Sequence, residues 1–157
     1  MTPRSTDRND QFKEVKQLTD AFARQEGRRP RILIALSKNE GGIKHNEIPS
    51  NFADFGFDVD IAPRLSSVEG LTKQAIENDV HMMLIFVKKP SDITLIDPIV
   101  KGLNDYHRRD ILLAVKTSAA LEVDQDLKNS GRVFVFDPSI KTNDLALYML
   151  NTFFENK

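Results

Sequence analysis

The sequence predicts an α/β domain built on a doubly wound, five-stranded parallel sheet. Short runs rich in Ile, Val, Leu or Phe alternate with segments whose apolar residues recur at helical spacing. This alternation is typical of strand-helix-strand units, which pair their strands in parallel. A length of 157 residues with 40% hydrophobic and 29% charged content suits one globular domain.

The elements follow in order along the chain. A polar lead of about a dozen residues precedes an amphipathic helix, expected from Phe12 to about Gln25, which ends at a Gly-Arg-Arg-Pro break. Strands are predicted at 31–36, 57–61, 81–87, 111–116 and 132–136. Helices are predicted at 49–55, 68–78, 93–106, 123–129 and 143–154. The common strand order for this flavodoxin-like, Rossmann-like arrangement is 2-1-3-4-5.

Local signals refine the helix ends. Ser66 and Ser67 are expected to cap the helix at 68–78, and Ser91-Asp92 to cap the helix that follows. Pro98 favours a later start for that helix, because proline is tolerated in a first turn. Pro49 is expected to shorten the first crossover helix and to leave 36–48 as a long loop.

Composition excludes several classes of function. A formal charge of −1 argues against nucleic acid or an anionic membrane as a partner. The absence of cysteine excludes disulfides, thiolate metal sites and cysteine nucleophiles. No apolar run has the length that spans a bilayer, and we expect a cytoplasmic protein. The three histidines lack zinc-binding spacing; His81 is expected to be structural and His107 to be solvated.

Ligands of doubly wound sheets bind outside the carboxyl ends of the strands, where the winding reverses. Here that edge is expected to be built from 37–46, 86–90 and 116–119. The first of these segments matches neither a phosphate-binding P-loop nor a flavodoxin phosphate loop, and the third and fifth strand ends lack the Asp and Lys of a receiver domain.

Three stretches carry a resemblance to a known family: EGRRPRILIA at 26–35, FADFGFDVDIAP at 52–63 and QAIENDVH at 74–81. They closely resemble the cobalamin-binding domain of methylmalonyl-CoA mutase, and with a weaker later match the resemblance covers about 12–154. It implies homology and the same fold. It also implies that residues 1–30 form a polar lead and a connector helix, and that 31–157 form a cobalamin-binding-like domain.

The family binds cobalamin through a DxHxxG loop, an SxL motif and a GG pair at successive strand ends, and the resemblance places altered residues at each. Glu40 stands for the Asp and Gly42 for the cobalt-ligating His. Phe86 and Lys88 occupy the Ser and Leu positions of SxL. Lys116 and Thr117 replace the paired glycines, which in the family let the nucleotide tail of the cofactor lie against bare backbone.

Two of these features have alternative interpretations. Phe86 either plugs the tail slot, which we favour, or faces a helix layer as an ordinary core residue. His45 is a weak candidate for a substitute metal ligand, but we favour a loop histidine, because metal sites need an orienting partner. We therefore expect no bound cofactor, with cobalamin as the alternative.

Five lysines map to the same edge of the sheet. They form either a basic patch for an acidic partner or anionic ligand, or ordinary solvated side chains, which we favour. The five are Lys38, Lys44, Lys88, Lys89 and Lys116.

The resemblance leads to a functional hypothesis. The chain is expected to be a degenerate, non-catalytic component of an acyl-CoA mutase system, docked to a barrel-bearing partner subunit. One alternative is a cobalamin-carrying subunit of an adenosylcobalamin-dependent mutase with an altered binding mode. A weaker one is a sensor that binds another ligand at the same edge. The fold alone does not choose between these.

Overall fold

The computed structural model describes residues 3–35, 43–62, 67–118 and 123–156. It contains one five-stranded, fully parallel sheet of order β2-β1-β3-β4-β5, which confirms the predicted topology. The strands are β1 (Arg31–Ala35), β2 (Asp58–Ala62), β3 (Met82–Val87), β4 (Leu112–Thr117) and β5 (Val133–Phe136). The helices are α1 (Pro3–Glu26), α2 (Ile43–Phe55), α3 (Val68–Glu77), the 3-10 helix η1 (Pro90–Leu95), α4 (Ile96–Asp105), α5 (Gln125–Lys128) and α6 (Thr142–Glu155).

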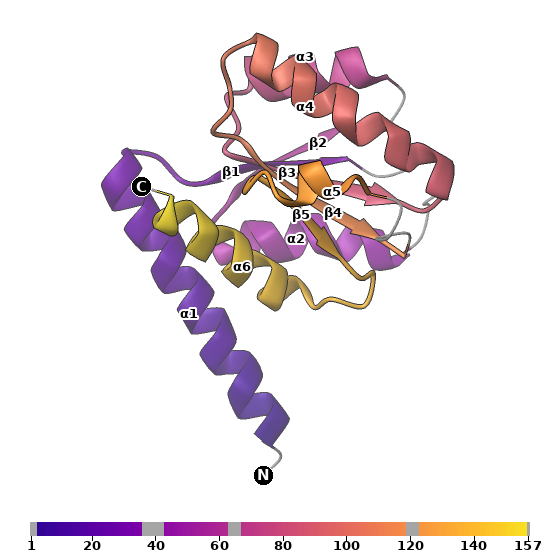
Figure 1. Cartoon of the computed structure of the whole chain (residues 1–157). Coiled ribbons are helices and arrows are strands. Elements are labelled where there is room, and N and C mark those ends of the chain that lie inside the picture. The colour runs from indigo at the N-terminus through magenta and orange to yellow at the C-terminus, as the bar shows by residue number, and fades with distance from the viewer. Residues whose placement is uncertain (1–2, 36–42, 63–66, 119–122, 157) are drawn as a thin grey trace.

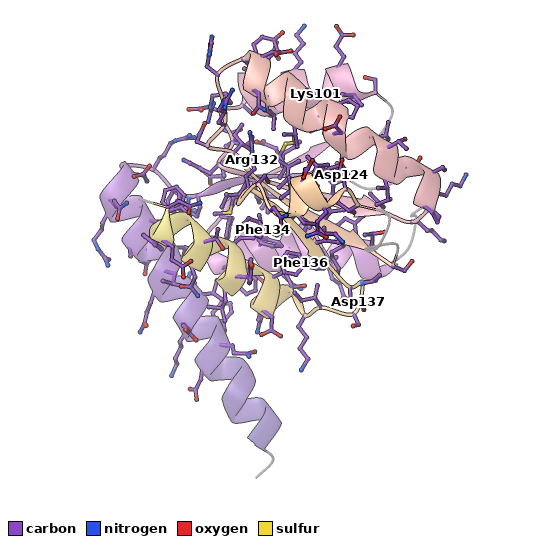
Figure 2. The ribbon with its side chains drawn as sticks, viewed as in Figure 1. Lys101, Asp124, Arg132, Phe134, Phe136 and Asp137 are labelled. Atoms are coloured by element: carbon purple, nitrogen blue, oxygen red, sulfur yellow. The ribbon has the colours of Figure 1, made fainter. Side chains whose placement is uncertain are left out.

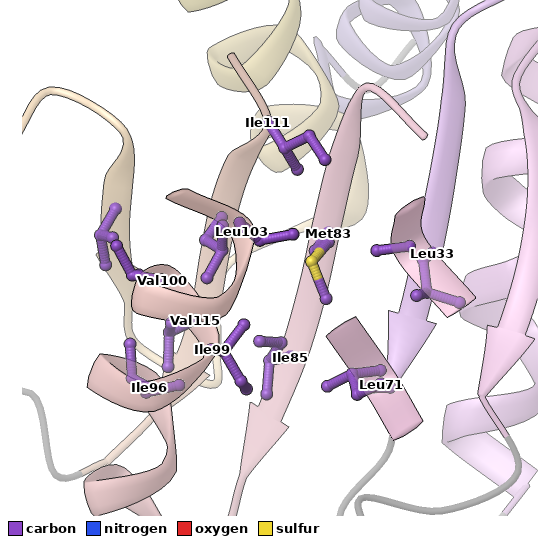
Figure 3. Packing of buried hydrophobic residues seen from close by; sticks show 14 of the residues in the cluster. Leu33, Leu71, Met83, Ile85, Ile96, Ile99, Val100, Leu103, Ile111 and Val115 are labelled. Atoms are coloured by element: carbon purple, nitrogen blue, oxygen red, sulfur yellow. The ribbon is translucent and has the colours of Figure 1, made fainter. Parts of the chain in front are cut away.

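Helices cover both faces of the sheet (Figure 1). Alternate residues of each strand point to opposite faces, so β3 sends Met83 and Ile85 to one layer and Leu84 and Phe86 to the other. The first layer contains α3 and α4, whose apolar residues interlock with the central strands (Figure 3). The second layer contains α1, α2 and α6. The central strands are thus buried on both sides, which explains their continuous apolar runs.

Helix α1 corrects one prediction. It begins at Pro3 rather than near Phe12, so the expected polar lead is helical in its backbone. No glycine and no second proline lies between Pro3 and Gly27, and proline suits a first helical position, where no N–H partner is needed. The carboxyl-terminal half of α1 packs on the domain, because Val15 and Phe22 are fully buried in the second layer.

Helix α2 corrects a second prediction. It begins at Ile43 and carries Pro49 in its interior, so the long loop expected at 36–48 ends earlier than predicted. Proline removes one intrahelical hydrogen bond. The apolar face of α2 compensates, since Ile48 and Phe52 bury their side chains in the second layer.

The predictions of helix ends are confirmed in part. Ser67 caps α3, with its hydroxyl accepting a hydrogen bond from the Gly70 N–H at 2.9 Å. Ser66 lies outside the described residues. Ser91 and Asp92 are not a cap, since both lie inside η1. The later helix start suggested by Pro98 is confirmed, because α4 begins at Ile96 and holds Pro98 in its first turn.

Candidate functional site

The carboxyl edge of the sheet is the expected site, and the structure describes part of it. Strands β1 and β3 are neighbours, and the helices that follow them, α2 and α4, lie on opposite faces. This is the point where the winding reverses. The fold therefore defines a doubly wound domain whose ligand edge is formed by the ends of β1, β3 and β4.

Two strand ends bring sequence-predicted residues together. In the parallel register of β3 and β4, Phe86 is opposite Lys116, and Val87 is opposite Thr117. Lys88 and Lys89 follow β3 directly and are exposed. The residues that the resemblance places at the SxL and GG motifs are therefore adjacent in space, as the sequence predicted.

Phe86 belongs to the core. It is 5% exposed and packs in the second layer, which also contains Ile34, Ala114 and Phe52. Phe86 therefore packs in a helix layer, and whether its ring also fills the family's tail slot stays a prediction. Burying a phenylalanine of this kind contributes about 1.5–3 kcal/mol of apolar transfer free energy.

Lys116 covers the Phe86 ring. Its Nζ lies 5.2 Å from the ring centroid, which is the geometry of a cation–π contact. Thr117 is 1% exposed and points to the opposite face, in the register of Val115. At the end of β4, side chains thus occupy both faces of the sheet.

Asp137, directly after β5, is a polar residue that sequence reasoning did not include in the edge. Its carboxylate accepts hydrogen bonds from the Ser139 hydroxyl at 2.6 Å and the Ser139 N–H at 2.9 Å. These bonds, with a smaller contribution from the charge of Lys116, lower the pKa of Asp137. The Asp-Pro-Ser sequence is the available signal, because Asp often accepts from the backbone two residues on.

The first loop is not part of the described site. Lys38, Glu40 and Gly42 lie outside the described residues. Lys44 and His45 lie in the first turn of α2, but their side chains are likewise outside the description. Whether this loop meets the ends of β3 and β4 stays a prediction.

The other two histidines have the expected surroundings. His81 is 9% exposed; its Nδ1 accepts a hydrogen bond from the Arg31 N–H at 3.0 Å, and its ring meets Phe22 edge-on at 4.7 Å. Burial, with a smaller contribution from the charge of Arg28, lowers the pKa of His81 to about 4. It is therefore a neutral, structural histidine. His107 is exposed in the turn after α4.

The described ranges contain neither a cluster of metal ligands nor a membrane-spanning helix. Among these residues, no group of three or more His, Cys, Asp or Glu side chains is arranged to hold a metal ion. None of the helices there combines the length and the apolar character needed to cross a bilayer.

Sequence comparisons identify relatives. The chain is 30% identical over 141 residues to the methylmalonyl-CoA mutase large subunit of Propionibacterium freudenreichii, covering 89% of this chain and 19% of that protein. It is 34% identical over 128 residues to the Porphyromonas gingivalis large subunit, covering 81% and 18%. It is 32% identical over 148 residues to the human mitochondrial mutase, covering 90% and 20%. No family model matches the chain.

Solved structures agree on the fold. A cobalamin-binding protein from Desulfitobacterium hafniense superposes with a TM-score of 0.61 at 14% identity, covering 92% of this chain and 70% of that one. A CheY-like protein from Pseudomonas aeruginosa gives 0.57 at 11% identity, covering 79% and 99%. At these identities the likeness establishes a flavodoxin-type fold.

The chain is a homologue of the cobalamin-binding region of methylmalonyl-CoA mutase large subunits, which confirms the predicted relationship. It spans about a fifth of the length of these relatives.

Proposed function

We propose that this domain is a non-catalytic component of a methylmalonyl-CoA mutase-type system and does not bind cobalamin in the manner of its relatives. The observation that carries the proposal is the burial of Phe86 at the position where the family has a small serine. That serine lines the slot for the nucleotide tail, whereas Phe86 is 5% exposed and packed against helix residues of the second layer. Its ring occupies volume that a bound tail would need.

The end of β4 supports the same proposal. The family's paired glycines expose bare backbone, but Lys116 and Thr117 carry side chains on both faces of the strand. Thr117 is 1% exposed, so its side chain is enclosed by neighbours. The described residues at this edge therefore do not fit the cofactor in the family's manner.

A protein partner is part of the proposal. The chain matches about a fifth of the length of its mutase relatives, and in this proposal it docks to a barrel-bearing mutase chain. The exposed lysines after β3, Lys88 and Lys89, offer positive charge to an acidic surface on such a partner. This contact would be sensitive to salt.

The test measures docking to a purified barrel-bearing acyl-CoA mutase chain that lacks its own cobalamin-binding region, by light scattering and calorimetry. We expect a stable complex that the double variant Lys88→Ala/Lys89→Ala weakens several-fold. The matched control is Lys73→Ala/Lys101→Ala, which removes the same charge from exposed lysines of α3 and α4. A complex equally tight in all three proteins would remove the lysines from the proposal, and no complex would contradict the docking role.

The second candidate is a cobalamin-carrying mutase subunit with an altered binding mode. Two comparisons favour this candidate: the relatives of the chain are mutases, and one structural neighbour is described as cobalamin-binding. In this mode His45 would replace the missing ligand at Gly42. Binding of adenosylcobalamin in a base-off form that His45→Ala abolishes would establish this candidate over the first.

A further inference from the structure

A second concave site lies at the amino-terminal edge of the sheet, away from the family's ligand edge. It is a hollow of about 560 Å³ between the carboxyl-terminal ends of α4 and α6, at the turns that precede β4 and β5. Figure 2 labels Arg132 just before β5 and Asp137 just after it, so the two sites lie at opposite ends of this strand. We name it the amino-edge hollow. Its lining includes Asn104, Arg109, Asp110, Leu112, Arg132 and Phe153.

Arg132 is the unusual residue of this hollow. It is only 9% exposed. One terminal nitrogen donates to the Asn104 side-chain oxygen, and the other donates to the backbone oxygens of Arg108 at 3.0 Å and Ile111 at 3.1 Å. Its Nε–H is buried and has no acceptor among the residues that the structure describes. A buried donor without a partner is destabilising, and native structures generally avoid it.

The charge of Arg132 is also poorly neutralised. Its three acceptors are uncharged oxygens, and no described carboxylate forms an ion pair with it. The nearby Asp110 is held by Arg108 through two hydrogen bonds of 3.0 Å each. Desolvation lowers the pKa of Arg132; the negative charge of Asp110 opposes this shift in part, and the positive charge of Arg109 adds to it. A buried cation beside a second cation favours an anion in the adjoining space.

The hollow also has apolar walls. Val100, Leu112 and Phe153 contribute apolar surface from both helix layers of the sheet. Small-molecule sites typically combine apolar walls with a few convergent polar groups. A guanidinium presents a planar set of donors that matches the two oxygens of a carboxylate.

From this geometry we propose that the amino-edge hollow binds a small organic carboxylate, with the anionic group at Arg132 and Arg109 and the apolar body against Leu112 and Phe153. This site is separate from the carboxyl edge, so it stands whether or not the domain binds cobalamin. Occupation would place a negative charge beside the buried guanidinium.

The experiment titrates the intact protein with sodium benzoate at constant ionic strength and follows the arginine Nε–H signals by ¹H–¹⁵N NMR. We expect saturable shifts of the Nε–H signal that is missing in Arg132→Lys. Arg109→Gln changes an exposed side chain and leaves the core intact; it should weaken the apparent affinity about tenfold. The matched control, Arg24→Gln, removes an exposed arginine from α1 and should leave the affinity unchanged.

Several results would overturn the proposal. They are non-saturable shifts spread over all exposed arginines, an affinity unchanged in Arg109→Gln, or no shift of the buried signal at millimolar benzoate. Inorganic phosphate serves as the second probe. If phosphate binds as tightly as benzoate, the apolar walls contribute nothing to affinity, and the carboxylate assignment is contradicted. If Arg132→Lys fails to fold, the comparison of Arg109→Gln with Arg24→Gln decides the outcome.

Discussion

Lys116 lies with its ammonium nitrogen 5.2 Å from the centre of the Phe86 ring, and the two residues are register partners on neighbouring central strands. The contact joins the two residues that the family resemblance places at the SxL and GG motifs. Phe86 is buried in the second layer, and the Lys116 ammonium lies over its ring. Phe86 and Lys116 thus form one packed unit.

Replacement of Phe86 tests how much this unit contributes to folding. Phe86→Ala should lower the free energy of unfolding by about 3–5 kcal/mol, because it leaves a cavity in a close-packed layer. Phe12→Ala is the matched control: its ring is 39% exposed, so we expect a loss of about 1 kcal/mol. Urea denaturation measures both. Equal losses in the two variants would contradict the assignment of Phe86 to the core.

Two buried threonines provide an internally controlled pair. Thr72 is 4% exposed and its hydroxyl has no hydrogen-bond partner among the described residues. Thr19 is 2% exposed and donates to the Phe55 backbone oxygen at 2.7 Å. Thr72→Val should therefore stabilise the protein by about 1 kcal/mol, and Thr19→Val should destabilise it by about 1–3 kcal/mol. Thermal and urea unfolding give the sign. Destabilisation of similar size in both would show that the Thr72 hydroxyl has a partner.

The lowered pKa of buried His81 should make the stability of the protein depend on pH. Its pKa is about 4 in the folded protein against 6.5 for the ordinary group, so between these values the unfolded chain binds a proton that the folded protein does not. The stability that neutral, buried His81 contributes is therefore fully present above pH 6.5. As the pH falls from 6.5 towards 4, the free energy of unfolding decreases by up to about 1.4 kcal/mol per pH unit. His81→Asn, which keeps an acceptor for the Arg31 N–H, should show a shallower decline.

The control for this slope is His107→Asn, because His107 is exposed and asparagine tolerates its positive φ of 61°. Its unfolding free energy should follow that of the unmodified protein between pH 7 and 4. A slope unchanged in His81→Asn would mean that His81 is protonated in the folded state near its ordinary pKa.

The sequence predicted the parallel sheet, because its buried strands are short continuous apolar runs and each predicted boundary in the described part lies within one residue. The start of α2 was missed, because Pro49 is a local signal against a helix, while burial of Ile48 and Phe52 is a tertiary effect. The prediction that Ser91 and Asp92 cap a helix was wrong, because the chain forms the 3-10 helix η1 there before α4.

The two candidate sites also differ in how far the sequence predicts them. Adjacency of Phe86 and Lys116 follows from strand order, so the sequence was sufficient to predict it. The amino-edge hollow was not predictable in this way. Arg132 finds its acceptors on residues 28, 24 and 21 positions earlier in the chain, and only the folded backbone brings those oxygens together.

The most direct test of the proposed function is a titration of the purified protein with adenosylcobalamin, followed by ultraviolet-visible absorption and calorimetry. We predict no saturable heat at micromolar protein and no base-off spectrum, because in the proposed function Phe86, Lys116 and Thr117 stand where the family receives the nucleotide tail. Micromolar or tighter binding with a base-off spectrum would contradict this account and would direct attention to His45 as the substitute ligand.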